Sequence, residues 1–551
     1  MSLEISKPRR VLEKTNSLRK NFLEMKPETA VGEFSDNIEE VVVPGTVRLV
    51  DNDSQLEGTG PDKIVLYPQP SDDPDDPLNW AKWRKILNIS LVYFYVFTTG
   101  IGGTSTYSIL TELSTATGIG LGSLVSGTGY LFLIAGWSNL FWQPLALSFG
   151  RRPVYLVSIL GCIAMSEWAA HVHSDSDWTA MRSLYGFFCA PVEVLPEHNV
   201  AELFFAHERG AYMGIYMLVL ASSNYIAPLI AGYMNNNIGW QWVQHWCAIV
   251  LGLNFVLSFF FYEDTLYLRS TAEVDMGDKG ITLKTTLTPL PGPSNKTFFS
   301  KMRLWTKNPN IGPREFIDMV WRPIYIFFAF PVVMWAGFYY ALSLVWYSVY
   351  NATASAIYSA PPYNFSSASV GLSYLGPLIG ALIGGIYSGP IADMIMMRIA
   401  RRNRGVREPE QRLWGLIFYV FVTPFGIFLW GIGAAHGIKW PGLAVAAALM
   451  GIANVVGGSF SLAYIVDCYR DISGEALVSA ILCRNTMSFG WNYAITPWIN
   501  HSGMQNTFIV VGVLAIVTGV TFLLMTAFGK RLRAASASRY WKFAETSLLK
   551  G

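Results

Sequence analysis

Residues 182–202 read RSLYGFFCAPVEVLPEHNVAE and place several ionisable side chains inside an apolar stretch long enough to cross a membrane. Its two prolines each remove a backbone donor and clash with the preceding turn, so the helix must bend or open there. Glu193 and Glu197 are four residues apart and share one helix face. Ionisable groups at membrane depth are costly and usually mark a functional site. The alternative is that the span ends early and both glutamates lie in a cytosolic loop.

The composition of the chain is that of a membrane protein, since 52% of its 551 residues are apolar and only 14% are charged. Soluble proteins carry about a quarter charged residues. The basic residues form short loop clusters, so we expect no nucleic-acid binding. The five cysteines are scattered, without the spacing of a disulfide framework or zinc site. We find no nucleotide-binding loop, metal cluster or nucleophile with a base, and therefore predict no enzyme, no cofactor and no metal.

Apolar runs of membrane length recur along the chain and predict an all-α protein with twelve transmembrane helices in two six-helix halves. The first six spans fall near residues 86–109, 121–147, 153–172, 178–205, 211–234 and 240–262. The second six fall near residues 323–349, 369–392, 413–434, 440–466, 475–499 and 507–528, with the seventh helix starting at Pro323.

These spans divide the chain into five parts. The parts are a disordered cytosolic tail (1–79), an N-terminal half (80–262), a central cytosolic loop (263–322), a C-terminal half (323–530) and a second cytosolic tail (531–551).

Basic residues alternate between the loops and so predict the orientation. Arg151 and Arg152 follow span two, six arginines of residues 398–412 follow span eight, and the alternate loops contain only Lys439. This pattern places both termini in the cytosol. Three glycosylation sequons begin at Asn351, Asn364 and Asn500. In this orientation they fall in loops that face outside, which predicts a glycoprotein.

Six plus six spans around a central loop is a layout that resembles the major facilitator superfamily, in which two halves rock about a midplane site. After span eight, the string GPIAD ending at Asp393, followed by Arg398, resembles the cytosolic loop signature of that superfamily. The first-half loop keeps Arg151 and Arg152 but has Leu147 where the aspartate would be. The resemblance implies that Asp393, Arg398 and the two first-half arginines act in gating. The alternative for Arg151 and Arg152 is an arginine loop that only fixes the topology.

Four longer strings resemble a fungal branch of the twelve-span drug:proton antiporter family. They are DPDDPLNWAKWRK (73–85), EVLPEHNVAELFFAHERG (193–210), ARRNRGVREPEQRLW (400–414) and DCYRDISGEALVSAILCRNTMSFG (467–490). That branch includes secondary-metabolite efflux pumps and the yeast permease for histidinol and polyamines. Arg182 matches the arginine of the family's proton-linked motif, and residues 223–232 resemble a weakened antiporter motif.

The two glutamates of the bent helix also predict proton coupling from their own chemistry. Like charges on one face do not both ionise cheaply in a low dielectric, so at least one should have a raised affinity for a proton. We predict that Glu193 is the coupling carboxylate and that Glu197 shares its proton or binds a cationic substrate. The family resemblance implies that Arg182 also takes part in proton coupling.

Arg484 lies well inside span eleven and needs an acidic or carbonyl partner. Asp467 is one possible partner. A gate or scaffold role, or contact with an anionic substrate, would explain the arginine. A substrate cavity is predicted from aromatic residues spaced along span seven and from polar residues in other spans: Trp335, Tyr339, Trp346, Asn224, Tyr225, Asn454, Asn485 and Asn492. The alternative for the aromatic residues is a lipid-facing or interfacial belt.

Together these patterns predict a monomeric, multi-pass transporter in a fungal plasma membrane, whose partners are a small-molecule substrate, protons and the lipid bilayer. Efflux by proton antiport is the first prediction. Proton-driven import of organic cations such as polyamines is the alternative, and a transporter-like sensor is an alternative of another class.

Overall fold

The computed structural model describes residues 44–45, 47–48, 73, 76–267, 273–277, 280–284, 303–305, 308, 311–402 and 406–548. Most of the predicted N-terminal tail, nearly half of the predicted central loop and the last three residues of the predicted second tail therefore lie outside the described residues.

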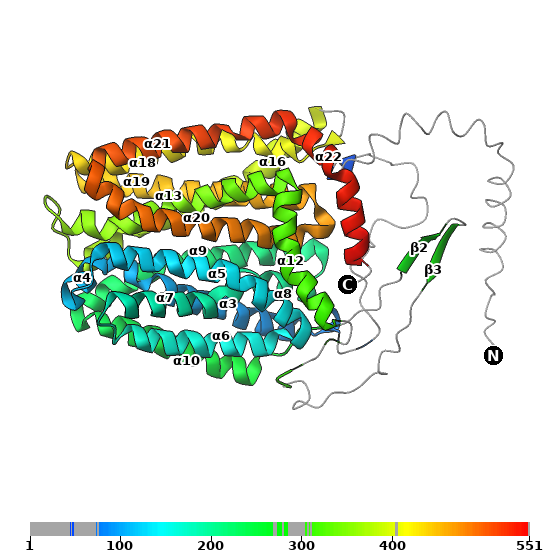
Figure 1. Cartoon of the computed structure of the whole chain (residues 1–551), viewed down its shortest axis with the longest axis horizontal. Helices are drawn as coiled ribbons and strands as arrows, with labels where there is room; N and C mark the ends of the chain where they lie inside the picture. The colour runs from blue at the N-terminus through cyan, green and yellow to red at the C-terminus, as the bar shows by residue number, and fades with distance from the viewer. Residues whose placement is uncertain are drawn as a thin grey trace, which may run out of the picture.

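Long helices of the two halves run side by side along one axis, with the N-terminal half below and the C-terminal half above in Figure 1. The first half contains η1 (Pro77–Asn79), α3 (Lys82–Thr104), η2 (Ser105–Ser108), α4 (Leu110–Thr117), α5 (Leu121–Phe149), α6 (Arg151–Ala169), α7 (Asp175–Cys189), η3 (Ala190–Glu193), α8 (Leu195–Leu203), α9 (Ala206–Ile238) and α10 (Trp240–Phe261).

The second half follows the linker helix α12 (Pro313–Ala329) and ends close to the C-terminus. It contains α13 (Pro331–Ser359), α14 (Ser367–Ser373), α15 (Leu375–Ile386), η4 (Tyr387–Ile391), α16 (Ala392–Arg402), α17 (Glu410–Leu413), α18 (Leu416–Ala435), α19 (Trp440–Cys468), η5 (Arg470–Ile472), α20 (Ser473–Ser502), α21 (Met504–Val520) and α22 (Phe522–Leu548).

Within the described ranges, nine helices are long and apolar enough to cross a membrane. Three further helices, α6, α7 and α20, lie parallel among them (Figure 1). When α7, η3 and α8 count as one pass, and α14 and α15 as another, the described helices make the twelve passes that the apolar runs predict. The predicted helical membrane fold is confirmed.

Local signals explain several helix ends. Gly118 adopts φ 74° where α4 ends, a left-handed conformation that favours glycine. The Ser174 hydroxyl accepts a hydrogen bond from the Asp177 backbone N–H at 3.2 Å and so caps α7. The turn at Gly118 precedes the second pass, and the cap at Ser174 separates the third pass from the fourth.

The seventh pass begins at Pro331 rather than at Pro323. Phe330 is extended (φ −119°, ψ 97°), as is usual for a residue before proline, and Pro331 then starts α13. Pro323 lies inside the separate helix α12, which crosses the end of the bundle at a steep angle (Figure 1).

Two small antiparallel sheets accompany the helices. β1 (Val47–Arg48) pairs with β4 (Val406–Arg407), and β2 (Glu273–Gly277) pairs with β3 (Gly280–Lys284). The Pro44 carbonyl accepts a hydrogen bond from Arg533 on α22. A short piece of the predicted disordered tail is therefore ordered against the C-terminal half.

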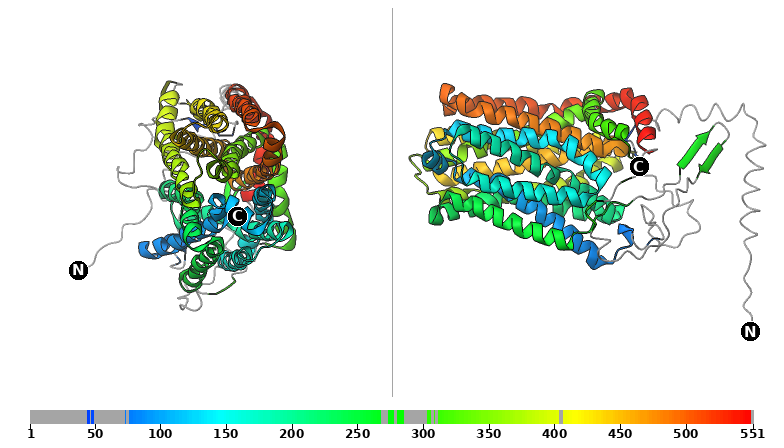
Figure 2. Two further views of the ribbon diagram at one scale, coloured as in Figure 1. Left: turned by 90° about the vertical axis from the view of Figure 1, so that its left-hand side faces the viewer. Right: turned by 60° about the horizontal axis from the view of Figure 1, so that its bottom comes forward.

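The two halves pack closely at the end of the bundle opposite the termini. A Cβ added to Gly232 on α9 would lie 2.3 Å from the Ser367 carbonyl oxygen on α14, so only glycine permits this approach. The Thr111 and Ser355 hydroxyls also meet across the halves at 2.8 Å. Figure 2, left, views the bundle from this end.

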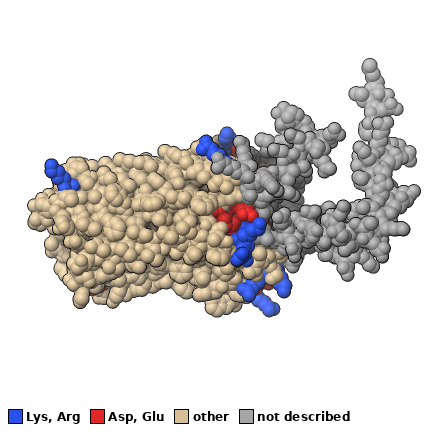
Figure 3. Space-filling model, turned by 90° about the horizontal axis from the view of Figure 1, so that it is seen from above, with Lys and Arg blue, Asp and Glu red and all other residues tan. Residues whose placement is uncertain are grey.

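Charged side chains on the face drawn in Figure 3 gather mainly at the end of the bundle where the termini lie. The wall between the two ends is almost free of them. This distribution matches a membrane-spanning body, and the charged end is the one that the loop pattern predicts to face the cytosol.

Candidate functional site

The fourth pass is interrupted where its two prolines fall. α7 ends at Cys189, η3 contains Pro191, and α8 starts again at Leu195 with Pro196 in its first turn. Proline is tolerated in a first turn because the backbone donor it lacks has no helical partner there. The predicted bend is confirmed, and it places Glu193 at the break.

Glu193 binds Arg484 of the opposite half. The Arg484 guanidinium donates to Glu193 Oε1, and Asn485 Nδ2 donates to Glu193 Oε2 at 2.9 Å. Asn139 Nδ2 of α5 lies 3.4 Å from the same Oε2 atom. The side chains of Arg484 and Glu193 are only 10% and 13% exposed. The ion pair therefore joins η3 and α5 of the first half to α20 of the second.

Further contacts hold the Arg484 side chain in place. Arg484 Nη1 donates to Tyr340 Oη at 2.5 Å, and Arg484 Nε donates to Asn485 Oδ1 at 3.1 Å. The guanidinium carbon also lies 5.0 Å from the centre of the Tyr340 ring. Arg484 is eleven residues into α20, which puts it about 16 Å from the helix start at 1.5 Å per residue.

Asp467 is not the partner of Arg484, so that prediction is wrong. Asp467 Oδ2 instead lies 3.5 Å from Arg412 Nε, because Asp467 lies in the last turn of α19 at the charged end of the bundle whereas Arg484 lies deeper. Sequence reasoning missed Tyr340 and Asn139 as contacts of the ion pair. Asn139 had a detectable signal, since it is a polar residue within a long apolar span.

Glu197 lies one turn beyond Glu193 and is half-buried. Its carboxylate makes no hydrogen bond or ion pair to the residues that the structure describes. The neighbouring His198 ring nitrogen Nε2 lies 3.3 Å from Gln143 Nε2. In the described part of the chain, no three His, Cys, Asp or Glu residues come together to hold a metal ion.

Arg182 is buried within the first half, away from the two glutamates. Its Nη2 atom donates to the Gly103 carbonyl at 2.9 Å and lies 3.2 Å from Thr128 Oγ1. It is eleven residues from Glu193, about 16 Å along the pass. The structure does not bring Arg182 into contact with Glu193, and any part it has in coupling must act through the helices between them.

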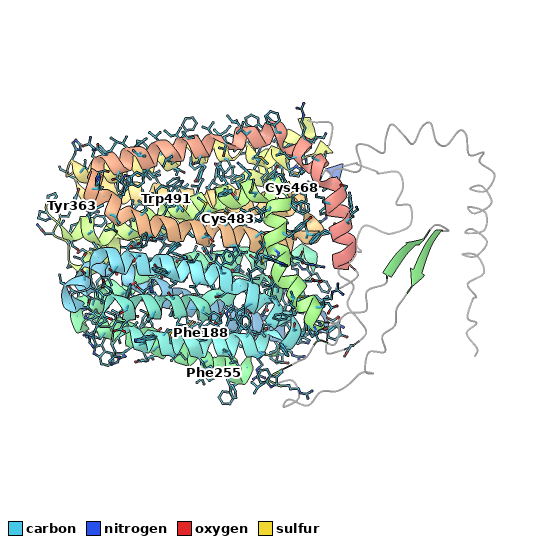
Figure 4. All side chains as sticks on the ribbon, viewed as in Figure 1. Phe188, Phe255, Tyr363, Cys468, Cys483 and Trp491 are labelled. Carbon is cyan, nitrogen blue, oxygen red and sulfur yellow. The ribbon has the colours of Figure 1, made fainter. Side chains whose placement is uncertain are left out.

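The predicted aromatic cavity residues pack against other helices of the C-terminal half. Trp335 Nε1 donates to Thr521 Oγ1 at 3.2 Å, and Tyr339 Oη donates to the Gly519 carbonyl at 3.3 Å. The Trp346 ring lies 5.3 Å from the ring of Trp491, which Figure 4 labels inside this half. These contacts are those of helix packing, and a role in substrate binding stays a prediction.

The predicted polar residues fall into two groups. Asn485 belongs to the ion-pair cluster, and Asn492 lines a small cavity of about 10 Å³ with Tyr107 of η2 and Ser348 of α13. That volume is close to the space one water occupies, and the cavity lies between the halves. The second group, Asn224, Tyr225 and Asn454, lies outside the ion-pair cluster and the cavity. Asn224 donates to the carbonyl of Leu220 at 2.9 Å, and Tyr225 lies beside Tyr347 and Asn454.

The charged end carries a matching ion pair in each half. Arg151 at the start of the third pass binds Glu202 at the end of the fourth. Arg412 at the start of the ninth pass lies beside Asp467 at the end of the tenth. Sequence reasoning named Arg151 and Asp467 but missed both of their partners, which only the packing of the helices identifies.

The other predicted gating residues are less connected to this arrangement. Arg152 Nη2 donates to the Phe259 carbonyl at 2.6 Å, and the Arg398 side chain is exposed. The side chain of Asp393 lies outside the described part of the structure. Their gating role stays a prediction.

Only two of the three sequons are accessible. Asn351 is 7% exposed and lies inside α13, so its assignment to a loop is wrong. The helix continues through it because the apolar run breaks only at the prolines after Ser359. Asn364 lies in the loop after α13 and is exposed, and Asn500 is exposed near the end of α20.

Comparisons with known proteins agree with this architecture. The Major Facilitator Superfamily profile matches residues 87–407. An uncharacterized MFS-type transporter of Schizosaccharomyces pombe is 31% identical over 87% of this chain and 90% of its own length. Protein HOL1 of Saccharomyces cerevisiae is 28% identical over 89% of this chain and 95% of its own.

More distant similarities extend this picture. A probable efflux pump, mfs2 of Aspergillus flavus, is 22% identical over 74% of this chain and 93% of its own. The solved structure of the human organic anion transporter MFSD10 superposes with a TM-score of 0.53, at 15% identity, covering 80% of this chain and 99% of that chain. The structural likeness supports the fold alone.

Proposed function

Because this chain belongs to the major facilitator superfamily of transporters, we propose that it exports a small organic solute in exchange for protons. It is a multi-pass membrane protein and a transporter rather than an enzyme. Relatives that carry efflux-pump names support the direction of transport. The charge pattern of the loops supports an orientation with both termini in the cytosol.

The observation that carries proton coupling is the Glu193–Arg484 ion pair between the halves. Transporters of this fold work by moving one half against the other, so a contact that crosses the seam must change during the cycle. Separating a buried ion pair leaves two uncompensated charges, which costs several kcal/mol. Protonation of Glu193 removes one of the charges and lets Arg484 move away.

The coupling step is therefore a proton taken up by the Glu193 carboxylate when the halves part. The neutral carboxyl group can still accept a hydrogen bond from Asn139, which belongs to the same half as Glu193. The proton leaves when the halves close and Arg484 returns to its position beside Glu193. The paired charges at the start of the third and ninth passes act at the cytosolic end as gate contacts.

The half-buried Glu197 carboxylate favours a second candidate, the proton-driven import of an organic cation. A carboxylate that has no partner among the described residues and lies inside a bundle can bind an ammonium group. Both candidates use Glu193, and they differ in the direction of substrate movement relative to protons.

Purified protein reconstituted in liposomes separates these candidates. In antiport, an acidic lumen drives uptake of the aromatic cation ethidium while a pH-sensitive dye reports alkalinisation of the lumen. In import by symport, an acidic outside drives uptake of labelled spermidine while the lumen acidifies. Uptake of both probes that is unchanged by either pH gradient contradicts proton coupling altogether.

A further inference from the structure

Helix α12 turns a row of large apolar side chains away from the protein. These side chains, with their exposed fractions, are Ile317 (64%), Trp321 (63%), Tyr325 (52%) and Phe328 (72%). Their spacing of three and four residues puts them on one helix face. The opposite face is buried at Pro323, Ile326 and Ala329. An apolar face of this size needs an apolar environment.

The position of α12 indicates which environment that is. The helix lies across the charged end of the bundle, at a steep angle to the membrane-spanning helices (Figure 1). An amphipathic helix in this place and orientation lies in the membrane interface, with its apolar face in the acyl region. Trp321 and Tyr325 are residues enriched at that depth.

A groove separates α12 from α22 on the same side. It has a volume of about 560 Å³, within the range of sites that bind small molecules. Its apolar walls are formed by Trp321, Ile324, Tyr325, Phe328 and Phe543. The rings of Tyr325 and Phe543 stack across the groove, with centroids 5.7 Å apart and planes 8° from parallel.

Charged residues of both signs lie in and beside the groove. Arg322 in its wall is paired with Glu475, at 3.1 Å between Nη1 and Oε1. Asp318 also lines the groove. Three exposed basic residues are close in sequence to residues that line the groove. Arg314 lies one helical turn before Asp318, and Arg539 and Lys542 lie four residues and one residue before Phe543.

We propose that this groove binds one anionic phospholipid of the adjacent leaflet. The acyl chain packs against the apolar walls, and the headgroup lies among Arg314, Arg539 and Lys542, because basic side chains at the membrane surface attract anionic headgroups. In the orientation proposed above this is the cytosolic leaflet.

The lipid would contact a helix that touches both halves of the transporter. Val320 and Ile324 of α12 pack in one hydrophobic cluster with side chains of α5 and α20, the helices that supply Asn139 and Arg484 to the ion pair. Val194, next to Glu193, belongs to the same cluster. Lipid in the groove would therefore stabilise the seam beside the coupling pair.

Thermal unfolding of the purified full-length protein in detergent tests the site. Titration with phosphatidylserine should raise Tm at lower lipid concentration than titration with phosphatidylcholine does. The variant Arg314→Gln/Arg539→Gln/Lys542→Gln should lose this preference, with apparent affinity for phosphatidylserine falling by about fivefold per neutralised residue. The control Arg398→Gln removes an exposed arginine of the same end on α16 and should keep the preference. An equal response to both lipids, or a preference that survives in the triple variant, overturns the proposal.

A photocrosslink identifies the occupant independently of stability. Trp321→p-benzoylphenylalanine in membranes should label phospholipid upon irradiation, detected by mass spectrometry of the peptide. Crosslinks to residues 268–310 of the same chain, or to a second copy, would instead assign the groove to protein and refute the lipid site.

Discussion

Replacing Glu193 by glutamine tests the coupling mechanism most directly. The substitution keeps the size and hydrogen-bonding oxygen of the side chain and removes its charge. Arg484 then keeps its hydrogen bonds to Tyr340 and Asn485 but loses the carboxylate of the opposite half. We expect a protein that folds and binds substrate but no longer links transport to protons.

The size of the effect follows from the burial of the pair. Removing one partner of a buried ion pair costs about 3–5 kcal/mol, and side-chain exposures of 10% and 13% place this pair in that class. Because glutamine still accepts a hydrogen bond, we expect the lower end, about 3 kcal/mol. That is roughly a hundredfold shift toward states in which the halves are parted, at about 1.4 kcal/mol per factor of ten.

The assay compares two modes of ethidium flux in liposomes. Glu193→Gln should retain exchange of ethidium at equal pH, while accumulation driven by an acidic lumen should fall to the level of empty liposomes. The matched control is Glu475→Gln, which removes a carboxylate from an ion pair with Arg322 of the linker helix α12 and leaves the Glu193–Arg484 pair intact. This control should keep pH-driven accumulation.

Two outcomes would refute the reasoning. Accumulation by Glu193→Gln with wild-type dependence on the pH gradient would remove Glu193 from the coupling step. Equal loss in Glu193→Gln and Glu475→Gln would show that the defect is general destabilisation. In a double-mutant cycle, Glu193→Gln/Arg484→Met should be more stable than Arg484→Met alone, because no buried charge is left unpaired.

Three further predictions concern the fold that supports this site. Arg533→Gln should lower the free energy of unfolding by about 3–5 kcal/mol, because the side chains of Arg533 and Glu410 are only 0% and 7% exposed in their ion pair. Lys530→Gln should cost less than about 1 kcal/mol, because the Lys530 side chain is 52% exposed in its ion pair with Glu408. Chemical denaturation compares the two variants, and equal effects would contradict this difference in burial. Gly232→Ala should lower Tm and impair transport, because the new Cβ would lie 2.3 Å from the Ser367 carbonyl oxygen. The control is Gly214→Ala on the same helix, where a new Cβ has no atom within 4 Å. This control should change neither Tm nor transport. Asn351→Gln should leave electrophoretic mobility unchanged, whereas Asn364→Gln should remove any glycosidase-sensitive shift at that site; loss of a glycan in Asn351→Gln would contradict its burial in α13.

The local properties of the chain were sufficient to predict the passes and their interruption. The length of an apolar segment determines whether it can cross a bilayer, and proline disrupts only the helical turn in which it lies. The spans and the break at Pro191 and Pro196 could therefore be inferred without knowing which other helices pack against them. The seventh pass was misplaced because α12 is apolar on one face and adjoins α13, and apolar composition does not distinguish an interfacial helix from the start of a span.

Only the tertiary structure determined the partners. Glu193 and Arg484 are 291 residues apart, and no spacing rule links positions on two helices of different halves. The same holds for Asp467, which was paired with the wrong arginine, and for Trp335 and Tyr339, whose rings pack toward α21. Sequence periodicity gives the face of a helix on which a residue lies, whereas the neighbour that this face meets depends on how all the helices pack together.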